Sequence, residues 1–278
     1  MNASERLESF FKSEGIEFWG VLDYRDAHEV SPHIAKRAGF TPKSIIMYLI
    51  PYFVSEGENL SAYATSLDYH LIIREINERL AKAVAEIFPD CQTRGYGDHS
   101  PIDERGAALS LGLGLLGENG LLINEKYGSY VFIADLVTSV EPTALSASRP
   151  MPVKRCIGCK KCIASCPTGI LGGEGCDCLS SITQRKGALL DFEVDLMRKF
   201  NTVWGCDECQ RHCPYNLRAA QTPISFFYRD RTLRLSKELV SGMSDEEFST
   251  RAFAWRGRAV VERNLSYFEG AERKYERD

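Results

Sequence analysis

Two closely spaced runs of cysteines constrain this chain more than any other feature. The first run, CxxCxxCxxxCP, extends from Cys156 to Pro167. In proteins that hold two iron-sulfur clusters, this spacing lets three thiolates bind one cluster while the fourth binds the other. A second cluster is therefore expected downstream. The run CxxCxxxCP from Cys206 to Pro214 repeats the last three cysteines and the proline, which fits that expectation.

The second run lacks a first cysteine, and Cys178, or alternatively Cys176, can supply the missing thiolate. We expect crossed ligand sets. One [4Fe-4S] cluster is assigned to Cys156, Cys159, Cys162 and Cys213, and the other to Cys166, Cys178, Cys206 and Cys209. Zinc is the alternative metal, because thiolates in tight pairs also bind zinc. The repeated Cys-Pro ending favours iron-sulfur clusters, and Cys91 and Cys176 are then expected to be free thiols.

Composition places the chain among ordinary globular proteins, since 44% of its 278 residues are hydrophobic and 26% are charged. Neither a secretory signal nor an apolar segment of membrane-spanning length is visible, so we expect no membrane partner. Clustered cysteines without a signal peptide indicate metal binding in a reducing cytoplasm. The net charge of -4 gives no general attraction to nucleic acid, so no DNA partner is expected and any tRNA contact needs a local basic face.

Hydrophobic periodicity predicts both helices and strands before the cysteine runs. Helices are expected over residues 4–14, 70–88 and 100–111. Strands are expected over residues 18–23, 44–50, 121–124 and 130–137, with 44–50 buried in the centre of a sheet and the last two paired around a turn at Gly128. This mixture predicts an α+β or α/β sandwich.

Prolines and composition suggest three consecutive segments. Residues 1–150 are expected to form the first domain, with the boundary near Pro150 and Pro152. Residues 151–222 form a two-[4Fe-4S] ferredoxin-like domain, and residues 223–278 form a helical C-terminal tail.

A glycine-rich stretch, Gly112-x-Gly114-x-x-Gly117, matches the dinucleotide-binding fingerprint literally. That fingerprint must follow a strand and open a helix, whereas here a helical stretch comes before it and a strand after it. A nicotinamide site is therefore disfavoured. The glycines can still let the backbone approach a flat cofactor closely.

Asp98 and His99 lie in a predicted turn just before a helix. Such an aspartate often caps its turn, and a single histidine is more often structural than a ligand. The same holds for Asp68 and His70 near the start of the helix predicted over residues 70–88. These residues alone do not identify a site.

Taken together, these stretches make the chain resemble the epoxyqueuosine reductase family. The resemblance covers most of the chain and is carried by residues 63–70 (Tyr63-Ala, Asp68-Tyr69-His70), Asp98-x-x-Pro101-x-x-Glu104-Arg105, Gly112 to Asn119, Gly128-Ser129, the two cysteine runs, Asp245 to Phe248 and Arg263-Asn264. Many unrelated proteins share the cysteine spacing alone, but not this ordered set.

The resemblance implies a cobalamin-dependent oxidoreductase with two [4Fe-4S] clusters that acts in queuosine biosynthesis and tRNA processing in the cytoplasm. The N-terminal domain would be a nitroreductase-like cobalamin-binding sandwich, and an external low-potential donor would supply electrons. The reaction would be reduction of epoxyqueuosine to queuosine in tRNA, with Asp98 as the proton donor. Cobalamin contacts would come from Tyr69, Arg105, Gly112, Gly114, Gly117, Asn119 and Ser129.

Several positions depart from the family pattern. Leu67, Leu115 and Glu118 stand where arginine, tryptophan and lysine are usual, and the chain resembles a short form without the C-terminal helical repeats. Two alternatives follow: a short paralogue that reduces a small molecule, and a two-cluster electron-transfer protein without corrin. The basic segment from Arg251 to Arg263 is either a phosphate-facing patch or a solvated helix face.

Overall fold

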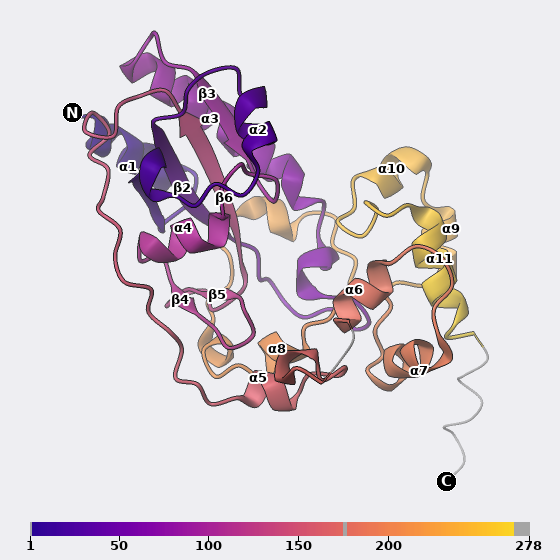
Figure 1. Cartoon of the computed structure of the whole chain (residues 1–278). Coiled ribbons are helices and arrows are strands. Elements are labelled where there is room, and N and C mark those ends of the chain that lie inside the picture. Colours follow the sequence, from indigo (N-terminus) through magenta and orange to yellow (C-terminus); the bar gives the residue numbers. More distant parts are fainter. Residues whose placement is uncertain (1, 175–176, 270–278) are drawn as a thin grey trace. The chain divides into compact units, whose positions relative to one another are not determined.

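The computed structural model describes residues 2–174 and 177–269, which pack as two compact units (Figure 1). The sheet unit comprises the described residues of 1–52, 70–158 and 218–224, and the cysteine unit comprises those of 53–69, 159–217 and 225–278. The units interleave along the chain, where the sequence suggested three consecutive segments. Residues 53–69 in particular pack with the cysteine unit.

A four-stranded antiparallel sheet forms the centre of the sheet unit, with strand order β1-β2-β6-β3. Its strands are β1 (Trp19–Asp23), β2 (Ser44–Pro51), β6 (Val131–Thr138) and β3 (Thr93–Tyr96). The prediction of a buried central strand at 44–50 is confirmed, since every residue of β2 is buried. Its unbroken apolar run is explained because both faces of the sheet are covered.

Alternate residues of β2 face the two layers that cover the sheet. Ile45, Met47 and Leu49 belong to a core that includes α4 (Glu104–Ser110). On the other face, the ring of Tyr48 lies 5.3 Å from that of Phe11 in α1 (Ala3–Ser13). The Tyr48 hydroxyl also donates to Asn77 Oδ1 of α3 (Tyr69–Ile87) at 3.1 Å. The result is a mixed α+β sandwich.

The helices predicted near residues 4–14 and 70–88 are confirmed as α1 and α3, whereas α4 begins four residues later than expected, at Glu104. The predicted pairing of strands 121–124 and 130–137 is wrong. β5 (Leu122–Ile123) pairs instead with β4 (Leu115–Leu116) in a separate two-stranded sheet, while β6 lies between β2 and β3. Short hairpin strands carry too few alternating residues to reveal their partner. The remaining elements of the sheet unit are a 3-10 turn η1 (Tyr24–Asp26) and α2 (Pro32–Arg37).

Short helices joined by loops make up the cysteine unit. They are η2 (Ala62–Thr65), α5 (Lys161–Ala164), η3 (Ile170–Gly172), α6 (Leu179–Gln184), α7 (Asp191–Lys199), α8 (Glu208–Arg211), η5 (Ser225–Tyr228), α9 (Lys237–Gly242), α10 (Asp245–Ser249) and α11 (Arg258–Ser266), with η4 (Asn216–Arg218) at its border. Buried Trp204 and Phe253 centre the larger of its cores, and Ile182 and Met197 centre a smaller one. The unit therefore has real cores beside its cysteine loops. No described helix has the length and apolarity needed to cross a bilayer.

Candidate functional site

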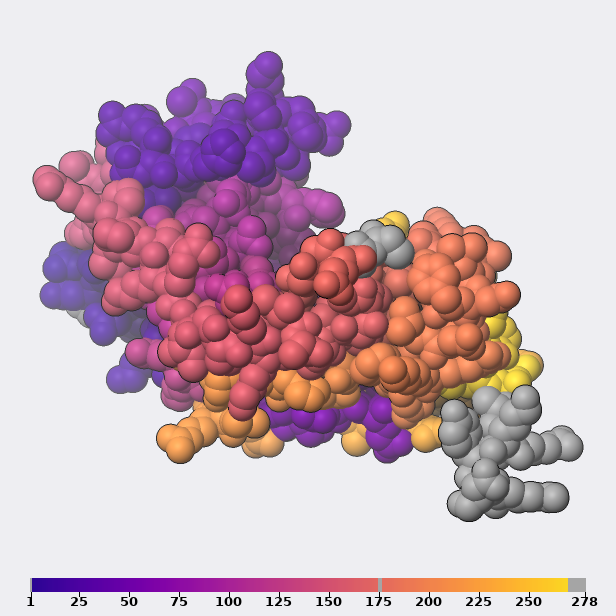
Figure 2. All heavy atoms as spheres, turned by 60° about the horizontal axis from the view of Figure 1, so that its bottom comes forward, coloured from indigo at the N-terminus to yellow at the C-terminus, as the bar shows by residue number. Residues whose placement is uncertain are grey.

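The two cysteine runs are brought together by a pair of one-turn helices. α5 carries Cys162 and α8 carries Cys209, and the Ser165 hydroxyl donates to the Glu208 carbonyl oxygen at 3.2 Å. The structure thus places the two runs side by side, as the crossed ligand sets require. Much of the segment that carries the cysteines, coloured red to orange, lies on the face shown in Figure 2.

Two of the thiols have pKa values that other cysteines influence. Burial raises the pKa of the Cys162 thiol, and the nearby Cys213 and Cys159 raise it further. Burial also raises the pKa of Cys206 to about 12, with a contribution from Cys178. Cys162 therefore neighbours a cysteine of the second run, and Cys206 neighbours the thiol expected to complete its cluster.

None of the described cysteines forms a disulfide. Within the described residues, no three or more Cys, His, Asp or Glu side chains are arranged to hold a single metal ion. Cys156 lies near the end of a segment of the sheet unit, Cys91 is a partly buried thiol between α3 and β3, and Cys176 lies outside the described residues.

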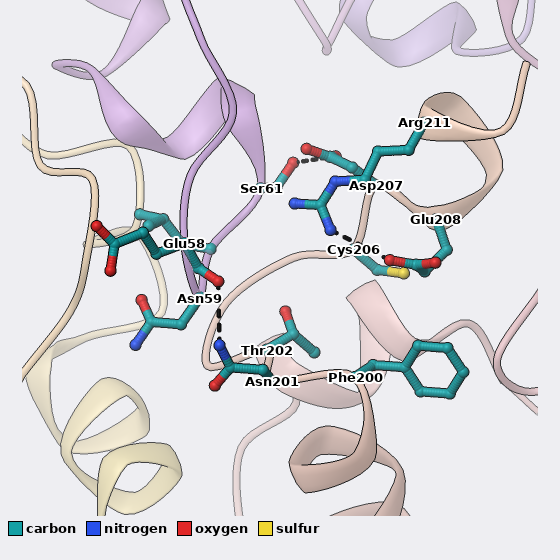
Figure 3. A pocket seen from close by; sticks show the side chains of 11 residues that line it. Glu58, Asn59, Ser61, Phe200, Asn201, Thr202, Cys206, Asp207, Glu208 and Arg211 are labelled. Atoms are coloured by element: carbon teal, nitrogen blue, oxygen red, sulfur yellow. Dashed lines mark hydrogen bonds and ion pairs between the residues drawn. The ribbon is translucent and has the colours of Figure 1, made fainter.

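A buried carboxylate fixes the second cysteine run. Asp207 accepts hydrogen bonds from the Ser61 hydroxyl, from the Ala62 backbone N–H at 2.6 Å and from Gln210 Nε2 at 3.1 Å. Figure 3 shows Ser61 pointing at the Asp207 carboxylate. The pocket in this view holds little more than a water-sized space, so its residues serve as a support for the run.

Gly205, just before this run, has φ +75°, and a Cβ there would lie 2.5 Å from Ser61 Cβ. Only glycine meets both conditions, because it tolerates positive φ and leaves room for close approach. The Gly205 N–H donates to Thr183 Oγ1 at 2.9 Å. Cys206 is therefore held on both sides by side chains distant in sequence.

The sheet unit contains an open pocket of about 500 Å³ that is lined by Asp98, Glu104 and Arg105 among others. Asp98 is half exposed and has φ +69°, and its Oδ2 lies 3.4 Å from His70 Nε2. The structure thus brings together two residues that the sequence could not connect. A carboxyl group at the pocket wall can exchange a proton with a bound substrate.

A second pair of carboxyl groups lies behind Asp98. Glu104 Oε1 accepts from the Asp98 N–H at 3.2 Å. Burial raises the pKa of Glu104, and Asp135 and Asp98 raise it further. Asp135 is fully buried in β6, and burial raises its pKa as well. Ser100 and Glu104 lower the pKa of Asp135 in part, although neither makes a hydrogen bond of normal geometry with it. Raised pKa values in both groups favour one shared proton at neutral pH.

The glycines of the GxGxxG stretch are explained by their own surroundings. A Cβ on Gly114 would lie 2.7 Å from the Ile123 carbonyl oxygen, and one on Gly117 would lie 2.3 Å from Asn119 Oδ1. These contacts belong to the β4–β5 hairpin, and Gly112 has φ +72° at the loop that leads into it. The structure gives these glycines a folding role that stands whether or not a cofactor approaches them.

The resemblance names four further residues, of which Arg105, Asn119 and Ser129 belong to the sheet unit. Arg105 donates to the Gly120 carbonyl oxygen at 2.5 Å, which ties α4 to the hairpin turn. Asn119 Oδ1 accepts from the Leu121 N–H, but its buried Nδ2 has no hydrogen-bond partner within the described residues. Ser129 is buried just before β6. Tyr69 begins α3 and belongs to the cysteine unit, where its ring packs edge-on against that of Tyr63.

The segment 251–263 contains four arginines, and three of them bind groups within the protein. These three form neither a phosphate-facing patch nor a solvated helix face. Arg251 binds the Asp230 carbonyl oxygen and Glu247, and Arg258 binds the carbonyl oxygens of the α9–α10 turn. Arg263 binds the carbonyl oxygens of Arg185 and Gly187. Their guanidinium groups satisfy backbone acceptors, a role that charge patterning cannot reveal.

Sequence reasoning also missed four structural positions. Asn264, quoted only as part of the resemblance, is fully buried and donates to the carbonyl oxygens of Thr183 and Val203. Glu104 was likewise quoted only as part of the resemblance, and Asp207 and Asp135 were given no role. A charged residue inside the apolar strand at 130–137 was the available signal for Asp135.

Residues 155–216 match the family described as the 4Fe-4S double cluster binding domain. The matched range contains all eight cysteines assigned to the two clusters, and Cys176 as well. It covers only the cysteine-bearing part of the chain.

Relatives named as epoxyqueuosine reductases extend the match to the sheet unit. The epoxyqueuosine reductase of Gloeobacter violaceus is 29% identical over 241 residues, which cover 81% of this chain and 71% of that protein. The chain is a relative of the epoxyqueuosine reductases. The Lactococcus garvieae enzyme is 32% identical over 213 residues, which cover 73% of this chain and 59% of the enzyme. The chain therefore spans between about half and 71% of the length of such relatives.

Solved epoxyqueuosine reductase structures share the fold. The Streptococcus thermophilus enzyme superposes with a TM-score of 0.75 at 23% identity, covering 96% of this chain and 80% of that one. An epoxyqueuosine reductase solved with an epoxyqueuosine-modified tRNA-Tyr stem loop gives a TM-score of 0.74 at 23% identity, covering 95% and 79%. The predicted α+β class is confirmed by this likeness.

Proposed function

We propose that this chain is a cobalamin- and iron-sulfur-dependent oxidoreductase that reduces epoxyqueuosine to queuosine in tRNA. The observation that carries the proposal is the combination, in one chain, of a two-cluster cysteine unit and a pocket with an acidic wall. An electron-transfer protein alone needs no such pocket. The name shared by the relatives and the stem loop bound to one of them support the substrate.

The eight thiols in the predicted crossed sets are the proposed ligands of two [4Fe-4S] clusters. The electrostatic influence of Cys213 on Cys162 and of Cys178 on Cys206 supports this assignment, with one pair for each cluster. The clusters would take single electrons from an external low-potential donor. The Asp207 support keeps the second run in place whatever the redox state.

A cobalamin site in a nitroreductase-like sandwich fits what the sheet unit offers. The open pocket of about 500 Å³ is of the size that binds part of a large ligand, and the unpaired buried Nδ2 of Asn119 is a donor without an acceptor. Arg105, Ser129, Tyr69 and the three glycines remain the proposed cofactor contacts. When bound, cobalamin supplies the electron transfer to the substrate.

Asp98 is the proposed acid. Opening an epoxide to an alkene with loss of water consumes two electrons and two protons, and the departing oxygen must be protonated. The Asp98 carboxyl group stands at the pocket wall with His70 beside it. These two side chains can deliver and replace a proton there.

A small-molecule substrate is the second candidate, because three of the four arginines that could have formed a phosphate-facing patch bind backbone carbonyl oxygens instead. The exception is Arg256, which stacks on the exposed Trp255 ring at 3.7 Å. Binding of tRNA at physiological salt separates the two substrates, since phosphate contacts make affinity fall steeply with salt. Either enzyme would work in the cytoplasm.

The cofactors are tested by anaerobic purification with cobalamin supplied, followed by metal analysis and absorption spectra under a strong reductant. We expect about eight iron atoms and one cobalt per chain, with reduction of the corrin. Eight iron atoms without cobalt would support the electron-transfer alternative. Zinc in place of iron would contradict both.

A further inference from the structure

The loop that presents Asp98 is held in an unfavourable backbone conformation. Its φ of +69° lies in the left-handed region, which costs a non-glycine residue of order 1 kcal/mol or more. Asp98 is also exposed and lies outside any helix or strand. Some contact must therefore keep it at the pocket wall.

Glu104 makes a contact that holds the backbone of this loop. It is the first residue of α4, and its Oε1 accepts from the backbone N–H of Asp98 at 3.2 Å. The acceptor side of this bond is anchored to a rigid helix, whereas the donor belongs to the loop. A hydrogen bond to the backbone fixes the loop without occupying the Asp98 carboxyl group.

Asp135 explains why Glu104 stays in that place. It belongs to the central strand β6, is fully buried, and has two oxygen atoms without a hydrogen-bond partner of normal geometry in the described part of the chain. Glu104 is among the side chains that act on the pKa of Asp135, so the two carboxyl groups lie close together, and burial raises the pKa of both. A proton held by such a buried pair stabilises it and favours an inward-facing Glu104.

We propose that Glu104, backed by Asp135, is a positioning residue that holds the proton donor Asp98 at the pocket wall. The catalytic part of this inference rests on the proposed function, because it takes Asp98 as the acid. The positioning part rests on the loop alone. Neither residue is proposed to touch the substrate.

Glu104→Gln and Glu104→Ala separate this role from simple packing. Glutamine keeps an oxygen that accepts from the Asp98 N–H, whereas alanine removes it. Asp90→Asn, at an exposed position in the same unit, is the matched control. Hydrogen exchange of the peptide covering residues 96–102, measured by mass spectrometry, reads the loop directly.

In the Ala variant we expect the Asp98 amide to exchange at least about tenfold faster, while residues 44–51 of β2 stay protected. The Gln variant should exchange like the wild type. In the assay, the Ala variant should lose about 10- to 100-fold in kcat at unchanged KM and metal content, and the Gln variant should recover most of it.

Unchanged exchange in the Ala variant would overturn the proposal, and so would a Gln variant as impaired as the Ala variant. Faster exchange that extends into β2 would show general loosening and would also contradict it. The exchange measurement needs no substrate. It therefore decides the role of Glu104 even for a chain that does not reduce epoxyqueuosine.

Discussion

The carboxylate of Asp207 accepts a hydrogen bond from the hydroxyl of Ser61, a residue of the segment that precedes the long helix α3. Both residues are buried in the cysteine unit, and the Ala62 N–H adds a second bond. A segment far away in sequence thus holds the loop that contains Cys206. Folding of residues 53–69 and binding at the second cysteine run are therefore coupled.

Asp207→Ala should weaken this coupling. The change leaves the Ser61 hydroxyl and the Ala62 N–H buried without their acceptor, at a cost of about 2–4 kcal/mol. We expect the iron content of the purified protein to fall by up to about half, because the cluster held by Cys206 and Cys209 loses its support. Asp195→Ala, on the exposed face of α7, should keep full iron content.

The eighth cluster ligand can be assigned by two matched variants. Cys178→Ala should lower the iron content by about half, because one cluster loses a thiolate, and Cys176→Ala should leave it unchanged. Iron and acid-labile sulfide analysis gives the answer. The reverse pattern would replace Cys178 by Cys176 in the ligand set.

Asn264 is predicted to be a stability determinant. Its side chain donates to the carbonyl oxygens of Thr183 and Val203 at 2.7 and 2.8 Å, and both bonds are buried. Asn264→Ala should lower the free energy of unfolding by about 2–3 kcal/mol, since two buried acceptors lose their donor. Glu262→Ala, exposed on the same helix, should change it by less than about 0.5 kcal/mol. Equal losses in the two variants would refute this role.

The carboxyl pair predicts how stability depends on pH. The pKa values of Glu104 and Asp135 are raised in the folded chain, so the folded state binds these protons more tightly than the unfolded one. Their contribution to the free energy of unfolding is complete below the pKa of the unfolded chain, about 4. It is lost as the pH rises through the raised pKa values of the folded chain.

Calorimetry over that pH range should therefore show a falling melting temperature for the wild type and a flatter profile for Asp135→Asn, which removes one of the two groups. Asp90→Asn should follow the wild type. If Asp135→Asn retained the full pH dependence, the buried pair would not be its source.

The sequence predicted the elements whose residues lie close together along the chain. The β2 strand and the α3 helix follow from apolar runs with regular spacing, and the cysteine spacing alone indicated two clusters. The partner of β5, the function of Arg263 and the contact between Asp207 and Ser61 depend on residues far apart in sequence. No period of two or 3.6 residues encodes such contacts.

In the candidate site, too, contacts between residues far apart in sequence could not be predicted. Asp98 was named through a resemblance, because its own neighbours suggested only a turn. Its contact with His70 and the carboxyl pair behind it arise where a loop, a helix and a central strand meet. Only the fold brings those three elements together.

Turnover of an epoxyqueuosine-modified tRNA stem loop tests the central claim most directly. Anaerobic protein loaded with iron, sulfide and cobalamin should, with a low-potential reductant, convert the nucleoside to a product that lacks one oxygen atom, as detected by mass spectrometry. Asp98→Asn, with unchanged iron and cobalt, should be slower by about 10²- to 10⁴-fold. No conversion by the fully loaded wild type, or full activity of the Asn variant, would contradict the account.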